Sequence, residues 1–278
     1  MRLFICTDLD RTLLPNGAEP ESPDARAWFH RVVALPEVTL AFVTGRDEKL
    51  ARQAIDDYKL PLPDFVVGDV GSSIYVCKQG VWQASSEWQV HIAPDWGSYN
   101  HSDLADLLEG FQELELQELS KQNTYKLSYY TPILSNHKDL VSILQKKLLS
   151  SNINASLNWS IDERANRGLL DILPACATKR HAIEFLMGKL EYGYDNTVFS
   201  GDSGNDLPVL ASAIPSILVR NASSDIKQEA EKMAKRANTE KFLYLAQGGF
   251  KEMNGNYAAG ILEGLAHYHP ELTALLEF

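Results

Sequence analysis

The stretch RLFICTDLDRTLL, residues 2–14, decides how the rest of the chain is interpreted. Its first part, LFIC at residues 3–6, is a short apolar run that can be buried on both faces, which predicts a central strand of a parallel sheet. Asp8 and Asp10 follow this run, and ligands of open α/β sheets bind beyond the carboxyl ends of the strands. Two carboxylates there are costly unless a cation neutralises them, although an isolated D-x-D-x-T is also an ordinary polar turn. Later stretches of the chain decide between these two interpretations.

The composition indicates a globular, soluble protein. The chain has 278 residues, of which 45% are hydrophobic, so it can bury a large core in one domain or in two of unequal size. A net charge of -11 and a pI near 5.1 argue against a nucleic-acid partner and against an anionic membrane surface. No charged leader with an apolar stretch begins the chain, so we expect a cytoplasmic protein with no membrane partner. We also expect a monomer.

The cysteines and histidines predict no metal or disulfide site. Cys6, Cys77 and Cys176 are odd in number and far apart, which fits neither a zinc cluster nor a disulfide framework. The seven histidines include no pair at helical metal-binding spacing. Any metal would therefore be bound by oxygen ligands.

A second buried strand is predicted at residues 38–43, VTLAFV, and it ends in Thr44-Gly45-Arg46 before a helix. A hydroxyl, a glycine and a guanidinium at a strand end that leads into a helix can cradle a phosphate or another oxyanion. The same three residues taken alone also fit an ordinary turn between a strand and a helix.

Two more polar segments follow late in the chain. Lys179 begins a predicted helix, where a cation opposes the helix dipole, so we expect it either to meet an anion or to be a solvated surface lysine. A buried strand at residues 197–200 ends in GDSGND, residues 201–206, which carries two carboxylates and an amide in a glycine-bearing loop. These segments repeat the arrangement of residues 2–14, in which polar groups follow a buried strand.

The pattern changes between residues 87 and 168, where amphipathic helices alternate with half-exposed strands. Helices are predicted at 101–119 and 137–150, and strands at 125–130 and 155–160. We therefore expect an α/β protein with a Rossmann-like parallel-sheet core, residues 1–84 and 168–278, and an inserted α+β cap domain, residues 85–167. The aromatic residues of this insert could stack on a sugar, but such residues more often pack in a core.

The four polar motifs together resemble those of the haloacid dehalogenase (HAD) superfamily of phosphohydrolases. They occur in the order DLDRT at 8–12, TGR at 44–46, Lys179 and GDSGND at 201–206, each at a predicted strand end or helix start. The insert resembles the large α+β cap of the superfamily's sugar phosphatases. The chain is most similar to sucrose-phosphate phosphatases, through the segments VGSSIY at 70–75, YKLSYY at 125–130, LLDILP at 169–174 and AAGILEGLAHY at 258–268.

This resemblance implies a Mg²⁺-dependent phosphatase that acts on a phosphorylated sugar through an aspartyl-phosphate. Asp8 is then the nucleophile, and Asp10 is the general acid and base, with a proton affinity raised by neighbouring carboxylates. The metal ligands are Asp8, the backbone carbonyl of Asp10 and Asp202, while Asp206 orients water and lysine. The resemblance also implies phosphate contacts by Thr44, Gly45, Lys179 and Asn205, and sugar contacts by Arg46, Lys126, Tyr129 and Asp171.

The sequence leaves several alternatives open. Sucrose 6-phosphate is the expected substrate, but mannosylfructose phosphate, glucosylglycerol phosphate, trehalose phosphate and hexose phosphates remain candidates. A sugar phosphomutase would use the same motifs, and a catalytically silent sugar-phosphate sensor would need only the binding groups. The presence of Asp10, which proton transfer needs and binding does not, favours an enzyme.

Overall fold

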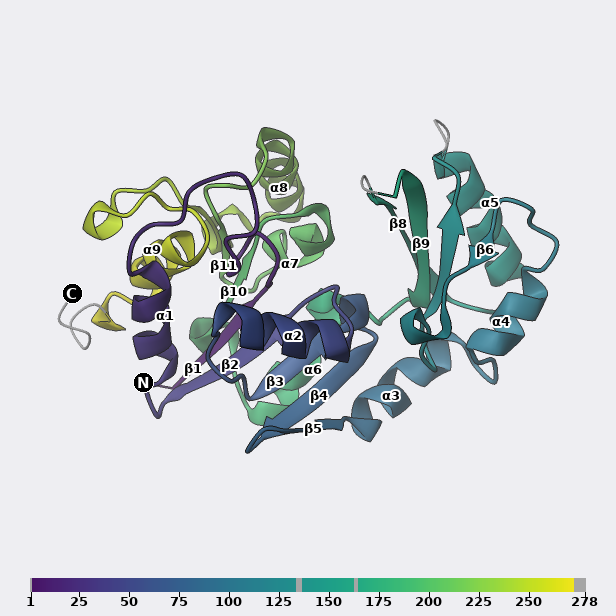
Figure 1. Ribbon diagram of the computed structural model, residues 1–278, viewed down its shortest axis with the longest axis horizontal. Helices are drawn as coiled ribbons and strands as arrows, with labels where there is room; N and C mark the ends of the chain where they lie inside the picture. Colours follow the sequence, from purple (N-terminus) through teal and green to yellow (C-terminus); the bar gives the residue numbers. More distant parts are fainter. Residues whose placement is uncertain (1, 134–136, 163–164, 273–278) are drawn as a thin grey trace. The chain divides into compact units, whose positions relative to one another are not determined.

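The computed structural model describes residues 2–133, 137–162 and 165–272. The chain forms two compact units (Figure 1), one of Met1–Ala84 with Lys179–Phe278 and one of Ser85–Thr178. Among the described residues, none of the helices combines the length and the apolar character that crossing a membrane requires.

The first unit is built on one sheet with the strand order β12-β11-β10-β1-β2-β3-β4-β5. Its parallel strands are β1 (Leu3–Thr7), β2 (Val38–Val43), β3 (Phe65–Gly68), β10 (Thr197–Gly201), β11 (Ser216–Leu218) and β12 (Leu243–Leu245). An antiparallel pair, β4 (Ser73–Lys78) and β5 (Val81–Ala84), extends one edge. The parallel-sheet core predicted from the sequence is confirmed.

Helices cover this sheet so that β1 is buried on both faces. Three of them, α1 (Ala25–Val33), α2 (Glu48–Tyr58) and α9 (Ala258–Tyr268), share one hydrophobic cluster with Leu3 and Ile5 of β1. The alternating residues Phe4 and Cys6 are also fully buried. The remaining helices of this unit, α6 (Lys179–Leu190), α7 (Leu207–Leu210) and α8 (Ser224–Ala237), pack in the series α6-α7-α8, and α7 and α8 also contact strands. Burial on both faces explains why β1 is an uninterrupted apolar run.

Strand β1 lies where the strand order reverses. The chain runs outward from β1 through β2 to β3, and after the second unit it runs outward on the other side from β10 to β12. Thr7 pairs with Phe42 of β2 and with Ser200 of β10, so the residues that follow these three strands meet at one edge of the sheet. This reversal is the position at which open α/β sheets bind ligands.

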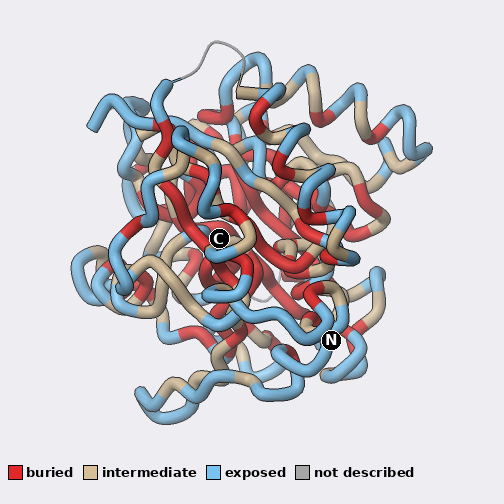
Figure 2. The backbone as a smooth tube through the Cα atoms, turned by 90° about the vertical axis from the view of Figure 1, so that its right-hand side faces the viewer, coloured by how far each residue is buried: buried red, intermediate tan, exposed pale blue. Residues whose placement is uncertain are grey.

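The second unit contains an antiparallel sheet with the order β6-β7-β9-β8. Its strands are β6 (Glu115–Leu116), β7 (Leu127–Thr131), β8 (Ala155–Asp162) and β9 (Arg167–Pro174), and its helices are α3 (Ser86–Ile92), α4 (His101–Leu107) and α5 (His137–Ser150). Side chains from α4, α5, β7 and β9 form a hydrophobic cluster of its own. Figure 2 shows the buried segments inside the fold and the exposed segments outside.

Short 3₁₀ turns complete the element list: Asp69–Gly71, Ala93–Asp95, Leu119–Lys121, Tyr194–Asn196, Gly204–Asp206, Glu240–Phe242 and Phe250–Glu252.

Two predictions about the second unit are wrong. The predicted end of the cap at residue 167 is too early, because β9 pairs with β7 and β8 and the unit extends to Thr178. The predicted helix 101–119 ends at Leu107, and its remainder forms turns and the short strand β6. Phe111 and Leu114 nevertheless pack on the cluster that holds Leu104 and Leu108, so apolar spacing continues beyond the end of the helix.

Candidate active site

Asp8 is the first residue after β1 and is almost completely buried. Its backbone N–H donates to the carbonyl of Ser200, which holds the start of the loop beside β10. The residue is 5% exposed, and its Oδ1 lies 3.0 Å from the Nζ of Lys179. The strand end therefore places one carboxylate next to one ammonium inside the protein.

Lys179 begins α6 and meets two carboxylates. Its Nζ donates to Oδ1 of Asp206 at 2.7 Å, in addition to its contact with Asp8. Burial disfavours the ammonium, but the charges of Asp206 and Asp8 outweigh this effect and raise the pKa of Lys179 above its usual value. The side chain is therefore charged, and these two contacts offset its position at the positive end of the helix dipole. The expectation that Lys179 meets an anion is confirmed.

Both carboxylate oxygens of Asp206 are used inside the loop after β10. Oδ1 accepts from Lys179, and Oδ2 accepts from the N–H of Asp202 at 3.1 Å and from the N–H and hydroxyl of Ser203 at 3.0 Å. A Cβ on Gly201 would lie 2.6 Å from Cγ of Asp206, so this close approach requires a glycine. Asp206 thus shapes the loop and orients the lysine.

Asp202 approaches Asp8 and Asp206 from its own strand end. Its side chain is 4% exposed, and its Oδ1 accepts from the hydroxyl of Thr12 at 3.2 Å. Arg11 adds a looser contact, with Nε 3.4 Å from Oδ2 of Asp202. Neither Thr12 nor Arg11 was among the predicted site residues, although the threonine of D-x-D-x-T was the available signal.

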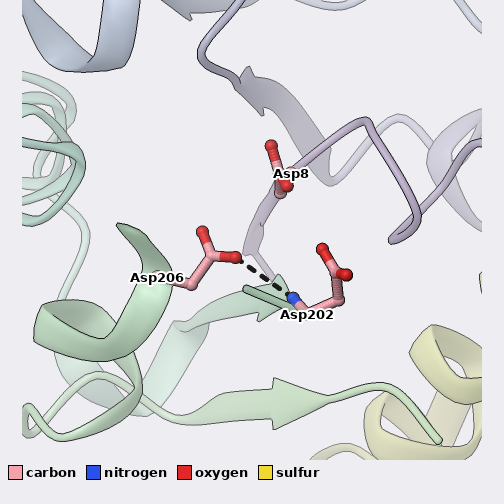
Figure 3. A group of neighbouring side chains, drawn as sticks. All are labelled: Asp8, Asp202 and Asp206. Carbon is pink, nitrogen blue, oxygen red and sulfur yellow. Dashed lines mark hydrogen bonds between the residues drawn. The ribbon is translucent and has the colours of Figure 1, made fainter. Parts of the chain in front are cut away.

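These three carboxylates gather in one place, as Figure 3 shows. Asp8, Asp202 and Asp206 each offer an oxygen within 4.8 Å of the others. Burial raises the pKa of Asp8 to about 8, with Lys179 opposing and Asp206 and Asp202 reinforcing the effect. Burial and Asp206 raise the pKa of Asp202 to about 6. The negative charge here exceeds what one buried lysine neutralises.

This donor set fits a hard divalent cation. Oxygen ligands are those that Mg²⁺ prefers, and it usually takes only one or two protein carboxylates and keeps several waters. Both oxygens of Asp206 already accept hydrogen bonds, from Lys179 and from the loop after β10, so Asp8 and Asp202 are the better candidates to bind such an ion. Burial and the neighbouring carboxylates raise the pKa values of Asp8 and Asp202, and a cation bound by both would oppose these two effects.

The carboxylate of Asp10 lies apart from this group. Arg46 donates to it through Nε at 2.8 Å and Nη2 at 2.6 Å, and Asn16 donates at 2.7 Å. Burial opposes ionisation of Asp10, but the hydrogen bonds and charge of Arg46 outweigh it and hold the pKa of Asp10 below its usual value. The predicted raised proton affinity of Asp10 is therefore wrong, because the side chain is bound by a guanidinium and, among the residues that the structure describes, its hydrogen-bond partners are all donors.

The other predicted phosphate contacts lie in two loops at the same sheet edge. Thr44 is fully buried after β2, and its hydroxyl accepts from the N–H of Arg46 at 3.2 Å. Gly45 has open space around it, since a Cβ there would meet only Val70, at 3.9 Å. Asn205 is exposed, and its Oδ1 accepts from the hydroxyl of Ser203 at 2.8 Å.

The predicted sugar contacts are divided between the two units. Arg46 belongs to the first unit and is bound to Asp10, whereas the other three belong to the second. Tyr129 is 5% exposed and packs in the hydrophobic cluster of the second unit, so its ring belongs to the core and its contact with a sugar stays a prediction. Asp171 accepts from the hydroxyl of Ser128 at 2.5 Å, and Lys126 is 6% exposed just before β7.

Comparison with known proteins agrees with this geometry. The family model of sucrose-6F-phosphate phosphohydrolase matches residues 1–269. A putative HAD-like hydrolase of Nitrosococcus oceani is 48% identical over 276 residues, which cover 99% of this chain and 74% of that protein. The mannosylfructose-phosphate phosphatase of Agrobacterium fabrum is 28% identical over 274 residues, which cover 95% of this chain and 96% of that protein.

A solved structure has the same fold. It is the sucrose-phosphatase of Synechocystis sp. PCC6803 in complex with sucrose and phosphate, with a TM-score of 0.75 and 24% identity, covering 96% of this chain and 98% of that chain. The buried carboxylates and lysine at the sheet reversal, together with a family match over almost the whole sequence, show that the chain belongs to the sucrose-6F-phosphate phosphohydrolase family of the HAD superfamily and is a phosphoric monoester hydrolase.

Proposed function

We propose that this protein is a Mg²⁺-dependent phosphatase that hydrolyses a sugar phosphate through an aspartyl-phosphate, with sucrose 6-phosphate as its substrate. The observation that carries the proposal is the buried group of Asp8, Asp202, Asp206 and Lys179 at the reversal of the strand order. Its excess negative charge calls for a cation, and a phosphate monoester needs positive charge around it before an anionic nucleophile can attack.

Asp8 is the proposed nucleophile. Its contact with Lys179 fixes the carboxylate at the end of β1, where a phosphoryl group can enter from the ligand edge of the sheet. Attack by an Asp8 oxygen forms an acyl phosphate as the sugar oxygen leaves, and water then releases phosphate and restores the carboxylate. When bound, Mg²⁺ supplies positive charge that favours ionised Asp8 and Asp202 and attracts the phosphate.

Asp10 is the proposed acid and base. Its carboxylate is separate from the buried group and is held by Arg46 and Asn16. It can therefore exchange a proton with the leaving oxygen while Asp8 attacks phosphorus. In the first step Asp10 gives a proton to the sugar oxygen, and in the second it takes one from the attacking water. The phosphoryl oxygens would be held by Thr44, Gly45, Lys179 and Asn205.

The second unit is the proposed specificity cap. Lys126 and Asp171 are its candidate sugar contacts, and Arg46 is that of the first unit. Sucrose 6-phosphate is supported by the family model and by the structural likeness to a sucrose-phosphatase. Mannosylfructose phosphate is the second candidate, because the Agrobacterium phosphatase aligns over nearly the full length of both proteins.

The test is phosphate release from a panel of sugar phosphates with Mg²⁺, with Asp8→Asn as the inactive control. We expect one glycosyl sugar phosphate to be preferred, and we expect chelation with EDTA to stop turnover until Mg²⁺ is restored. Activity that survives the chelator, or an Asp8→Asn variant that turns over, would contradict the proposed mechanism. Conversion of a sugar phosphate to its isomer without phosphate release would identify a phosphomutase, and binding without either reaction would identify a sensor.

A further inference from the structure

The carboxylate of Asp10 is held by Asn16, a residue to which none of the four motifs assigns a role. The Nδ2 of Asn16 donates to Oδ1 of Asp10 at 2.7 Å, and the Oδ1 of Asn16 accepts from the backbone N–H of Arg11 at 2.8 Å. One amide therefore bridges the side chain of Asp10 and the peptide that follows it.

The orientation of this amide follows from its partners. The N–H of Arg11 can only donate, so the oxygen of Asn16 must face it. The NH₂ group then faces Oδ1 of Asp10, which accepts from it whether or not Oδ2 carries a proton. Asn16 satisfies both neighbours in one orientation, and an aspartate at this position would satisfy only Arg11.

The backbone to which Asn16 is tied is itself fixed. Arg11 has φ 58°, a left-handed conformation that a non-glycine residue adopts only when its surroundings hold it there. Its carbonyl accepts from Nδ2 of Asn221 at 2.6 Å, and Oδ1 of Asn221 accepts from the N–H of Tyr257 at 2.9 Å. Asn16 thus connects Asp10 to a rigid part of the fold.

The hydrogen bonds treat the two oxygens of Asp10 differently. Oδ1 accepts from both Asn16 and Nη2 of Arg46, which uses both of its lone pairs. Within the described residues, Oδ2 accepts only from Nε of Arg46, so one of its lone pairs is free. Oδ2 is therefore the oxygen that can exchange a proton with a ligand.

We propose that Asn16 is a positioning residue for proton transfer, which holds Oδ1 of Asp10 so that Oδ2 faces the leaving group. This inference rests on the proposed function. In the first step the proton on Oδ2, which Asp10 took from water in the preceding turnover, moves to the sugar oxygen as its bond to phosphorus breaks, and Asp10 becomes a carboxylate. In the second step Oδ2 takes a proton from the water that attacks the acyl phosphate of Asp8, and the carboxylate of Asp8 leaves.

The test measures kcat/KM for two phosphate esters in wild type and in the variants Asn16→Ala and Asn16→Asp. A sugar phosphate that the wild type hydrolyses needs a proton on its leaving oxygen, whereas p-nitrophenolate leaves p-nitrophenyl phosphate without one. The ratio kcat/KM covers only steps up to phosphoryl transfer, so it isolates proton donation from the later hydrolysis. We expect kcat/KM to fall about 10-fold or more for the sugar phosphate and to change less than about threefold for p-nitrophenyl phosphate.

Asn221→Ala is the matched control, because it removes a hydrogen bond to the backbone of the same residue, Arg11, without touching Asp10. It should alter kcat/KM for both esters by the same factor. The inference is overturned if kcat/KM of the Asn16 variants falls equally for both esters or falls for neither. It is also overturned if Asn221→Ala lowers kcat/KM selectively for the sugar phosphate. A wild type that releases phosphate from neither ester, or an active Asp8→Asn variant, would instead refute the proposed function on which the inference rests.

Discussion

The substitution Asp8→Asn should stabilise the metal-free protein while it abolishes turnover. Asp8 is 5% exposed, and burial raises its pKa to about 8 even though Lys179 opposes the shift. Its environment therefore favours the protonated side chain over the ionised one. Asparagine has nearly the size and polarity of the protonated form and cannot ionise, so the variant should lack the penalty that wild type carries at high pH.

The magnitude follows from the raised pKa of Asp8. A carboxyl whose pKa is raised in the folded state contributes stability below its unfolded value, near 3.8, and loses it as the pH rises through about 8. The full shift corresponds to roughly 6 kcal/mol in the free energy of unfolding. Because the neighbouring carboxylates titrate together, they share part of this change, and we expect Asp8→Asn to gain at least about 2 kcal/mol over wild type above pH 8.

Urea unfolding in EDTA, at intervals from pH 5 to pH 8.5, measures this difference. We expect the advantage of Asp8→Asn to be small at pH 5 and to grow steadily with pH, and each kcal/mol should raise Tm by about 2–4 °C. Mg²⁺ should reduce the advantage, since an ion that binds the folded wild type stabilises it. A variant that is less stable than wild type at pH 8.5, or an advantage that does not change with pH, would refute the reasoning.

Three further substitutions test the surroundings of the site. Asp206→Asn should lower the free energy of unfolding by about 3 kcal/mol in urea titrations, because one amide cannot accept from both Lys179 and the loop donors; an unchanged unfolding midpoint would refute its role in shaping the loop. Gly201→Ala should cost about 1–3 kcal/mol and lower kcat, since its Cβ would lie 2.6 Å from Cγ of Asp206; full activity would show that the loop adjusts. Glu263 is 7% exposed in α9 and accepts from the hydroxyl of Tyr244 and from two backbone N–H groups. Glu263→Ala leaves these donors without their acceptor, so it should lower Tm and reduce the free energy of unfolding by about 2–3 kcal/mol. A loss under about 0.5 kcal/mol would contradict this.

The arrangement of the core could be predicted because the composition of each strand shows whether its faces are buried. LFIC in β1 is apolar since both faces of the strand are covered, and polar residues begin with Thr7, where the strand reaches the edge of the sheet. Parallel strands bring such ends together, so segments nearly 200 residues apart could be assigned to one site before any distance was known. Lys179 at the start of α6 was informative for a different reason, because a cation at this position opposes the helix dipole and so indicates a nearby anion.

The boundary of the second unit could not be predicted from apolar content alone. LLDIL in β9 looks like a buried core strand, but burial alternates over its first four residues, with Leu170 and Ile172 fully inside and Asp171 partly exposed. That alternation is typical of an antiparallel sheet with one open face, and Asp171 was its signal. The helix predicted at 101–119 failed for a related reason, because Phe111 and Leu114 continue helical spacing through turns that follow Leu108.

The surroundings of Asp10 depend on the path of a loop, which no local pattern encodes. Arg46 follows a different strand and Asn16 follows a turn, yet both reach the same carboxylate. Sequence reasoning placed Asp10 among carboxylates because its nearest acidic neighbour in the chain is Asp8. The structure separates the two side chains, and their pKa values move in opposite directions from the same starting value.

The carboxylates of the site therefore differ in how favourable their ionised forms are. The one lysine beside Asp8 does not offset the cost of ionising its buried carboxyl group. Asp206 instead accepts hydrogen bonds at both oxygens, from Lys179 and from the N–H groups of the loop. The substitution of aspartate by asparagine should therefore stabilise the metal-free protein at the first position and destabilise it at the second. A residue whose ionised form lowers stability is one that a fold retains for chemistry, and this contrast supports the proposal that Asp8 reacts while Asp206 orients its surroundings.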